Sequence, residues 1–205
     1  MHKKQYSKNK QASYQEPLDS RTAQQLLEDQ LLLLKLIYDK LSLLQYLRDA
    51  DDKKKVLIEH NAYMKYMSEL LYKGLVIDFV ALFGGDRSKE KNSLQMYYTN
   101  AYNDTIDADK LGAIRTALSR YKPMKNPIKR LTNLRDKEVS HYDITSTGNA
   151  RVTIRVNWEI VTIMEELFKV AKKVIGIGMV LPEDAFDATD KVAALDDMVT
   201  SMVKG

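Results

Sequence analysis

The chain of 205 residues contains no cysteine, which excludes disulfides, thiolate metal sites and cysteine nucleophiles. Glycine and proline are also scarce, with eight and four residues, and 44 % of the chain is apolar against 29 % charged. This balance argues against general disorder. No segment reaches the roughly 18 uninterrupted apolar residues of a membrane span, and no apolar run follows the basic N-terminus as in a secretory signal. We therefore expect a soluble cytoplasmic protein without membrane contact.

Leucine, lysine, methionine and glutamate are abundant, and all four favour helix. Residues 1–16 are polar and basic without a period, so they predict a flexible basic tail. Residues 17–181 carry the helical patterns and predict one all-α domain, an antiparallel helical bundle. Residues 182–205 form an acidic C-terminal segment with the pattern of a short helix, which packs back or binds a partner.

Caps, apolar periods and prolines predict four or five helices in this domain. In the first helix, leucines recur at three- and four-residue steps, which favours a core face over a dimer seam. Apolar and polar residues alternate over 150–156, which allows at most one short β-hairpin. The first three expected segments are a helix capped by Asp19 or Ser20, a helix over 54–83 ended by Gly84, and a short helix within 88–105. A further helix starts at about Asp107, and the next has Pro127 in its first turn and runs to His141. An extended piece over 150–156 precedes the last helix, which is capped by Asn157 and stopped by Pro182.

The formal net charge of +4 is unevenly distributed along the chain. The stretch from Lys110 to Arg135 carries eight Lys or Arg and no acid, whereas Pro182 to Gly205 carries six acids against two lysines. This asymmetry suggests a basic face with a separate acidic tail. The alternative for a charge run of this kind is an ordinary solvated helix surface.

The sequence lacks the motifs of several common kinds of binding or catalytic site. No glycine-rich loop has phosphate-binding spacing, and the three histidines are too far apart in sequence for a paired metal motif. No nucleophile elbow supports a serine triad, although the sequence leaves such a triad open. His60 lies on an expected helix without a partner motif, which favours a structural or surface role. We accordingly expect no metal and no cofactor.

One short stretch, NLRDKEVSHYD at 133–143, combines complementary chemistry. His141 can transfer a proton near neutral pH, and Arg135 is a permanently charged bidentate ligand for phosphate. Together they match cleavage of RNA without a metal, which needs a base for the ribose 2'-OH and a cation for the scissile phosphate. Six residues on a regular helix place two side chains about 120° apart, so the pair converges only if the helix ends or widens, or across two subunits. The alternative is an ordinary helix end, with Arg135 paired to Asp136 or Glu138.

The stretch LRDKEVSHYD resembles the ribonuclease signature of the HEPN superfamily, and it is most similar to the abortive-infection AbiU-type HEPN proteins. The likeness extends to the preceding PIKRL and the following VNWEI, and it covers about residues 20–180. Asp136 stands where asparagine is commonest in the family. The matching positions are Leu134, Arg135, Lys137, His141 and Asp143.

This resemblance implies an all-helical bundle, usually dimeric, in which two motifs meet across the interface in one cleft. It also implies a metal-independent endoribonuclease that leaves cyclic phosphate ends, in phage defence or a toxin-antitoxin system. His141 would be the general base or acid, Arg135 the phosphate ligand and Asp136 the group that orients one of them. An antitoxin or another protein is a further expected partner. The residues expected to bind the RNA backbone are Lys122, Lys125, Lys129, Arg130 and Lys137.

The second hypothesis is a non-catalytic HEPN dimer that binds RNA through its basic face or a protein through its acidic tail. Some HEPN domains are scaffolds of this kind, and Asp136 is the residue that favours this interpretation here.

Overall fold

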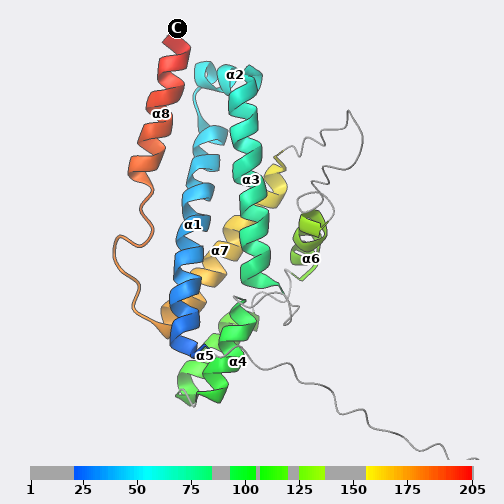
Figure 1. Ribbon diagram of the computed structural model, residues 1–205, viewed down its shortest axis with the longest axis vertical. Helices are drawn as coiled ribbons and strands as arrows, with labels where there is room; N and C mark the ends of the chain where they lie inside the picture. Colours follow the sequence, from blue (N-terminus) through cyan, green and yellow to red (C-terminus); the bar gives the residue numbers. More distant parts are fainter. Residues whose placement is uncertain (1–20, 85–92, 105–106, 120–124, 137–155, 205) are drawn as a thin grey trace, which may run out of the picture.

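The computed structural model describes residues 21–84, 93–104, 107–119, 125–136 and 156–204, and within these ranges it contains eight α-helices and no strand (Figure 1). The all-α prediction is therefore confirmed for this part of the chain, but four or five helices were too few. The predicted hairpin falls mainly on residues outside the described ranges. The helices are α1 Ala23–Asp49, α2 Asp52–His60, α3 Ala62–Phe83, α4 Leu94–Asn103, α5 Ala108–Ser119, α6 Lys125–Leu134, α7 Trp158–Gly178 and α8 Thr189–Lys204.

The leucine-rich first helix, α1, begins at Thr22 rather than at the predicted caps Asp19 or Ser20. The Thr22 side chain accepts a hydrogen bond from the Gln25 N–H, while the Gln25 side chain accepts one from the Thr22 N–H. This reciprocal capping box pairs donors at the helix start that have no partner within the helix. The leucine period forms a core face as predicted, with buried Leu27, Leu31, Leu34, Leu41 and Leu44.

The single helix predicted over 54–83 is wrong, because Asn61 divides it into α2 and α3. The Asn61 side chain accepts hydrogen bonds from the N–H groups of Tyr63 and Met64, so it caps α3. Its own N–H donates to the Leu57 carbonyl and closes α2. One residue thus ends one helix and starts the next. The predicted end at Gly84 is confirmed.

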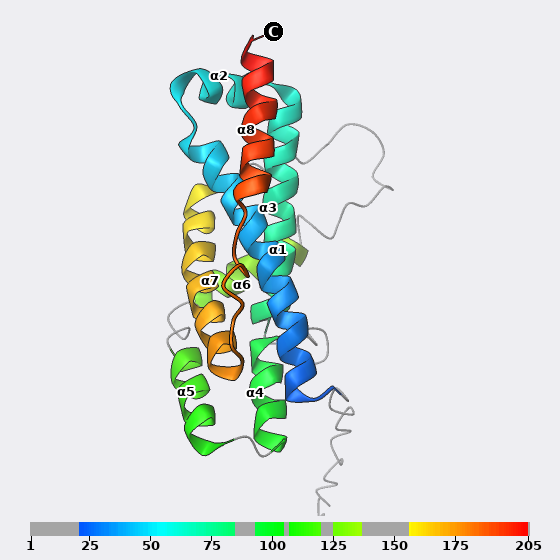
Figure 2. The ribbon, with the colours of Figure 1, turned by 90° about the vertical axis from the view of Figure 1, so that its left-hand side faces the viewer.

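Three long helices form the centre of the bundle. α1 packs most extensively against α3 and α7, and the buried side chains of Leu34, Phe79 and Met164 belong to this core. α4 and α5 lie together at the end of the bundle where α1 begins (Figures 1 and 2). α6 packs on α3, away from α5, which packs on α7.

α7 begins as predicted, with the Asn157 side chain accepting hydrogen bonds from the N–H groups of Glu159 and Ile160. It ends at Gly178, with Met179 as the C-cap, and therefore stops before Pro182 is reached. None of the helices in the described ranges is long and apolar enough to cross a membrane.

The acidic C-terminal segment forms α8, which packs back onto α1 and α2. Leu195 and Val199 are the buried residues of this helix. Asp196 accepts hydrogen bonds from the Tyr46 hydroxyl at 2.7 Å and the Lys54 ammonium at 2.5 Å. The acidic helix is therefore held by apolar contacts and by a polar pair drawn from α1 and α2.

Candidate functional site

α6 carries the start of the predicted site and has two different faces. Pro127 lies in its first turn, as predicted, where a missing N–H costs no helical hydrogen bond. Ile128 and Leu131 are 6 % and 2 % exposed and form the inner face, while α6 as a whole packs on α3. Lys129 and Arg130 are exposed to solvent. The helix thus presents two cations outward from a base of buried apolar residues.

Arg135 and Asp136 lie directly after α6, where the backbone adopts the wider turn of a π-helix. Such turns re-aim side chains and recur at functional sites. The Arg135 Nε donates a hydrogen bond to Asp136 Oδ1 at 2.9 Å, and the arginine side chain is 20 % exposed against 55 % for the aspartate. The ion pair between Arg135 and Asp136, which the sequence analysis gave as the alternative to an active site, is therefore present. A phosphate that binds Arg135 must compete with this carboxylate.

Arg135 is less exposed than the two cations of α6. Its side chain is partly buried, whereas Lys129 and Arg130 are exposed to solvent. The widened turn separates Arg135 from the regular part of α6 that carries Lys129 and Arg130.

Three of the eight predicted site residues lie outside the described ranges. This is the case for His141 and for two of the expected RNA-binding lysines, Lys122 and Lys137. Lys125 is the first residue of α6, and only its backbone is described. The distance between Arg135 and His141 accordingly remains a prediction.

The described part of the basic stretch is divided between two helices with different neighbours. Lys110 and Arg115 are exposed on α5, which packs against α4 and α7, whereas Lys129 and Arg130 are exposed on α6 against α3. Figures 1 and 2 show the two helices at different levels of the bundle. The two cation pairs therefore belong to separate places in the fold.

His60 is exposed at the end of α2, and its Nδ1 lies 2.8 Å from the Val56 carbonyl oxygen. This contact within its own helix agrees with the predicted surface role. Within the described ranges, no group of three or more His, Asp or Glu side chains is placed to hold a metal ion.

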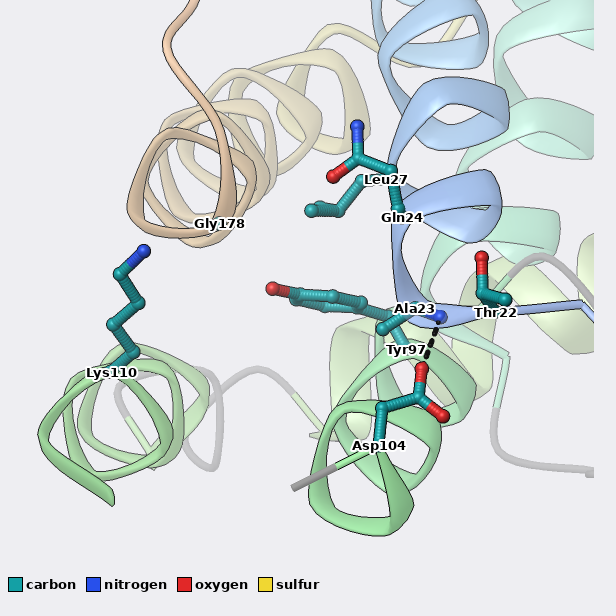
Figure 3. Close-up of a pocket in the computed structure, with 8 residues that line it drawn as sticks. All are labelled: Thr22, Ala23, Gln24, Leu27, Tyr97, Asp104, Lys110 and Gly178. Carbon is teal, nitrogen blue, oxygen red and sulfur yellow. Dashed lines mark hydrogen bonds between the residues drawn. The ribbon is translucent and has the colours of Figure 1, made fainter. Parts of the chain in front are cut away.

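The sequence did not reveal a pocket at the start of α1, where Tyr97 of α4, Lys110 of α5 and Gly178 of α7 meet (Figure 3). Tyr97 is one of twelve tyrosines and sits in a polar stretch that the sequence left uncertain. Only the packing of α4 against α1 and of α5 against α7 brings these residues together. Neither Arg135 nor Asp136 lines this pocket.

Comparisons with protein-family models, with curated proteins and with solved structures found no match for this chain.

Proposed function

We propose that the protein is a metal-independent HEPN-type endoribonuclease that cuts RNA through attack of the ribose 2'-OH. The observation that carries the proposal is the position of Arg135 in the widened turn at the end of α6, immediately before the segment that contains His141. A regular helix would point these two side chains about 120° apart, and a wider turn changes that angle. The all-α bundle is the fold that the resemblance implies.

In the proposed reaction, His141 accepts the proton of the 2'-OH as the 2'-oxygen attacks the adjacent phosphorus. The bond from phosphorus to the 5'-oxygen breaks, and the leaving oxygen takes a proton from the protonated histidine or from water. The products are a 2',3'-cyclic phosphate and a 5'-hydroxyl. Arg135 stabilises the negative charge that grows on the phosphate oxygens, and Asp136 orients the guanidinium through its Nε hydrogen bond.

The RNA backbone is bound by cations near this site, and Lys129 and Arg130 are the two whose exposure is described. The other members of the proposed surface are Lys122, Lys125 and Lys137. We further propose a homodimer in which the His141 of one copy meets the Arg135 of the other. The proposed setting is phage defence or a toxin-antitoxin pair, with an antitoxin or another protein as a further partner.

A second candidate function is a non-catalytic RNA-binding dimer. The observation that favours it is the 2.9 Å hydrogen bond between Arg135 Nε and Asp136 Oδ1, which partly neutralises the phosphate ligand before any RNA arrives. In this case RNA binding depends on salt, because phosphate contacts release counterions. Binding then persists in His141→Ala and weakens when Lys125, Lys129 and Arg130 are changed to glutamine.

The deciding experiment incubates the full-length protein with mixed single-stranded RNA in EDTA and follows cleavage by gel electrophoresis. The wild type is expected to cut RNA. His141→Ala is expected to cut at least about 100-fold more slowly, since general acid-base catalysis contributes this much to the rate. The matched control is His60→Ala, because His60 is exposed and contacts only its own helix in the described structure. It should cut as fast as wild type.

Four results separate the candidates. Cleavage that is equal in wild type and His141→Ala indicates a contaminating nuclease and contradicts the first function. Salt-dependent binding without cleavage supports the second function. Absence of cleavage by both proteins contradicts the first function, and binding that is insensitive to salt contradicts the second.

A further inference from the structure

The pocket in Figure 3 lies where the start of α1 meets α4, α5 and the end of α7, and it has a volume of about 330 Å³. This volume is at the lower end of the range for small-molecule sites. Ala23 and Leu27 of α1 supply apolar wall. The site is thus large enough for a small organic molecule and has both apolar and polar lining.

The Tyr97 hydroxyl is the central polar group of this pocket. Tyr97 is 1 % exposed, yet its hydroxyl forms no hydrogen bond with any described residue. Figure 3 shows the hydroxyl directed into the space between Gly178 and Lys110. Burial raises the pKa of Tyr97, so the hydroxyl stays protonated and can donate at neutral pH. The hydroxyl is therefore available to donate to a molecule in the pocket.

Gly178 makes room for this hydroxyl. A Cβ atom at position 178 would lie 2.4 Å from the Tyr97 hydroxyl oxygen and 2.6 Å from a Leu27 methyl carbon. Both distances are shorter than van der Waals contact. Any side chain at this position would therefore push Tyr97 or Leu27 out of place and close the pocket.

Lys110 supplies a charge on the opposite wall. Its side chain extends from α5 toward the end of α7 in Figure 3, and it forms no ion pair with any described residue. The pocket's carboxylate, Asp104, accepts a hydrogen bond from the Ala23 N–H at 2.7 Å. Its charge therefore faces the positive end of the α1 dipole. Two other lining donors already have acceptors, since the Thr22 hydroxyl donates to Gln25 and the Gln24 amide to Glu28. The Lys110 ammonium and the Tyr97 hydroxyl are the lining groups without an acceptor among the described residues.

We propose that this pocket binds a small organic acid, whose carboxylate pairs with Lys110 and accepts a hydrogen bond from Tyr97 while its apolar body packs on Leu27. A singly charged carboxylate fits better than a phosphate dianion, because one ammonium faces the ligand and Asp104 lies in the same pocket. This site is separate from the described part of the proposed ribonuclease site, since Arg135 and Asp136 do not line it.

The experiment titrates the full-length protein with hexanoate and benzoate by calorimetry at neutral pH, with hexanamide and benzamide as neutral counterparts. At least one acid is expected to bind, and its amide to bind at least about tenfold more weakly, because hydrogen bonds to charged groups are the stronger ones. Tyr97→Phe and Lys110→Gln should each weaken binding of the acid by about tenfold for the same reason.

Two variants on the same helices serve as controls, Tyr102→Phe on α4 and Arg115→Gln on α5, and both should bind like wild type. Tyr102 is 68 % exposed, and neither residue lines the pocket. Folding is checked by urea unfolding. Tyr97→Phe should be as stable as wild type, because it removes a hydroxyl that has no partner among the described residues.

The proposal is overturned if neither acid binds, if the amides bind as tightly as the acids, or if the control variants lose as much affinity as the pocket variants. Lys110 is exposed, so Lys110→Gln tests the site even if Tyr97→Phe unfolds.

Discussion

At the scale of single residues, the pairing of Arg135 with Asp136 decides how the proposed site behaves. The sequence offered two roles for Arg135, phosphate ligand or partner of a neighbouring acid, and the structure contains the hydrogen bond of the second role. The sequence alone could not have shown that the helix widens at Arg135, because the width of the turn depends on how the following residues pack. Likewise, the sequence could not show that the Arg135 side chain is partly buried, because burial depends on which residues pack around it.

Replacing Asp136 with asparagine should increase RNA affinity roughly threefold, because a partly exposed ion pair of this kind contributes up to about 1 kcal/mol. The neutral amide can still accept the hydrogen bond from Arg135 but no longer offsets its charge. Filter binding of single-stranded RNA at two salt concentrations measures the change. Asp184→Asn, an exposed acid before α8, is the control, and an equal gain in both variants would show a general charge effect instead.

At the scale of helices, the sequence predicted best where a cap and an apolar period coincide. Asn157 before α7 is such a place. The division at Asn61 was missed because the apolar pattern continues through it, and an asparagine within a helical pattern costs little by propensity alone. The end of α7 was placed too late because Pro182 is the stronger signal in the sequence, whereas the helix already stops after Gly178.

Asn61→Ala should lower the free energy of unfolding by about 1 kcal/mol, the usual cost of an N-cap. The N–H groups of Tyr63 and Met64 at the start of α3 lose their hydrogen-bond acceptor. The angle between α2 and α3 is then less well fixed. Urea unfolding measures the difference. Asn133→Ala, on the exposed side of α6, should change stability by less than about 0.5 kcal/mol. Equal losses would mean that Asn61 has no special role.

The attachment of α8 should depend on pH through Asp196. Hydrogen bonds from Lys54 and then from Tyr46 lower the pKa of Asp196 below its ordinary value. A carboxylate with a lowered pKa contributes stability that is fully present above its unfolded pKa and is lost as pH falls through the folded pKa. Asp196→Asn should therefore melt at a lower temperature than wild type at pH 7.

The two melting temperatures should converge as the pH falls below the ordinary range for aspartate, about 4. Asp190→Asn, in the first turn of the same helix, controls for the loss of one acid from α8. A difference between wild type and Asp196→Asn that persists unchanged at low pH would contradict this account.

At the scale of the whole molecule, the sequence predicted a helical bundle but not which helices adjoin. Amphipathic patterns show that a face is buried, and they do not identify the partner. The packing of α1 on α7, and of α5 and α6 on different helices, had to come from the structure. For the same reason the basic stretch could be seen in the sequence, while its division between two places in the fold could not.

The proposed composite site can be tested by mixing Arg135→Ala and His141→Ala subunits, each inactive alone. If each site combines the arginine of one copy with the histidine of the other, half of the dimers are mixed and each holds one intact site. Cleavage should then recover to about a quarter of the wild-type rate. If both residues of a site come from one copy, mixing restores nothing. Each variant incubated by itself is the control.

The position of α1 in the chain also affects how the protein is made. The leucine face of α1 leaves the ribosome before both of its main partners, α3 and α7, and α7 follows only after α2 to α6. At ordinary synthesis rates, this face waits on the order of ten seconds for α7. During that interval α3 is the main early partner of α1, so the nascent chain exposes a strip of leucine that chaperones can bind.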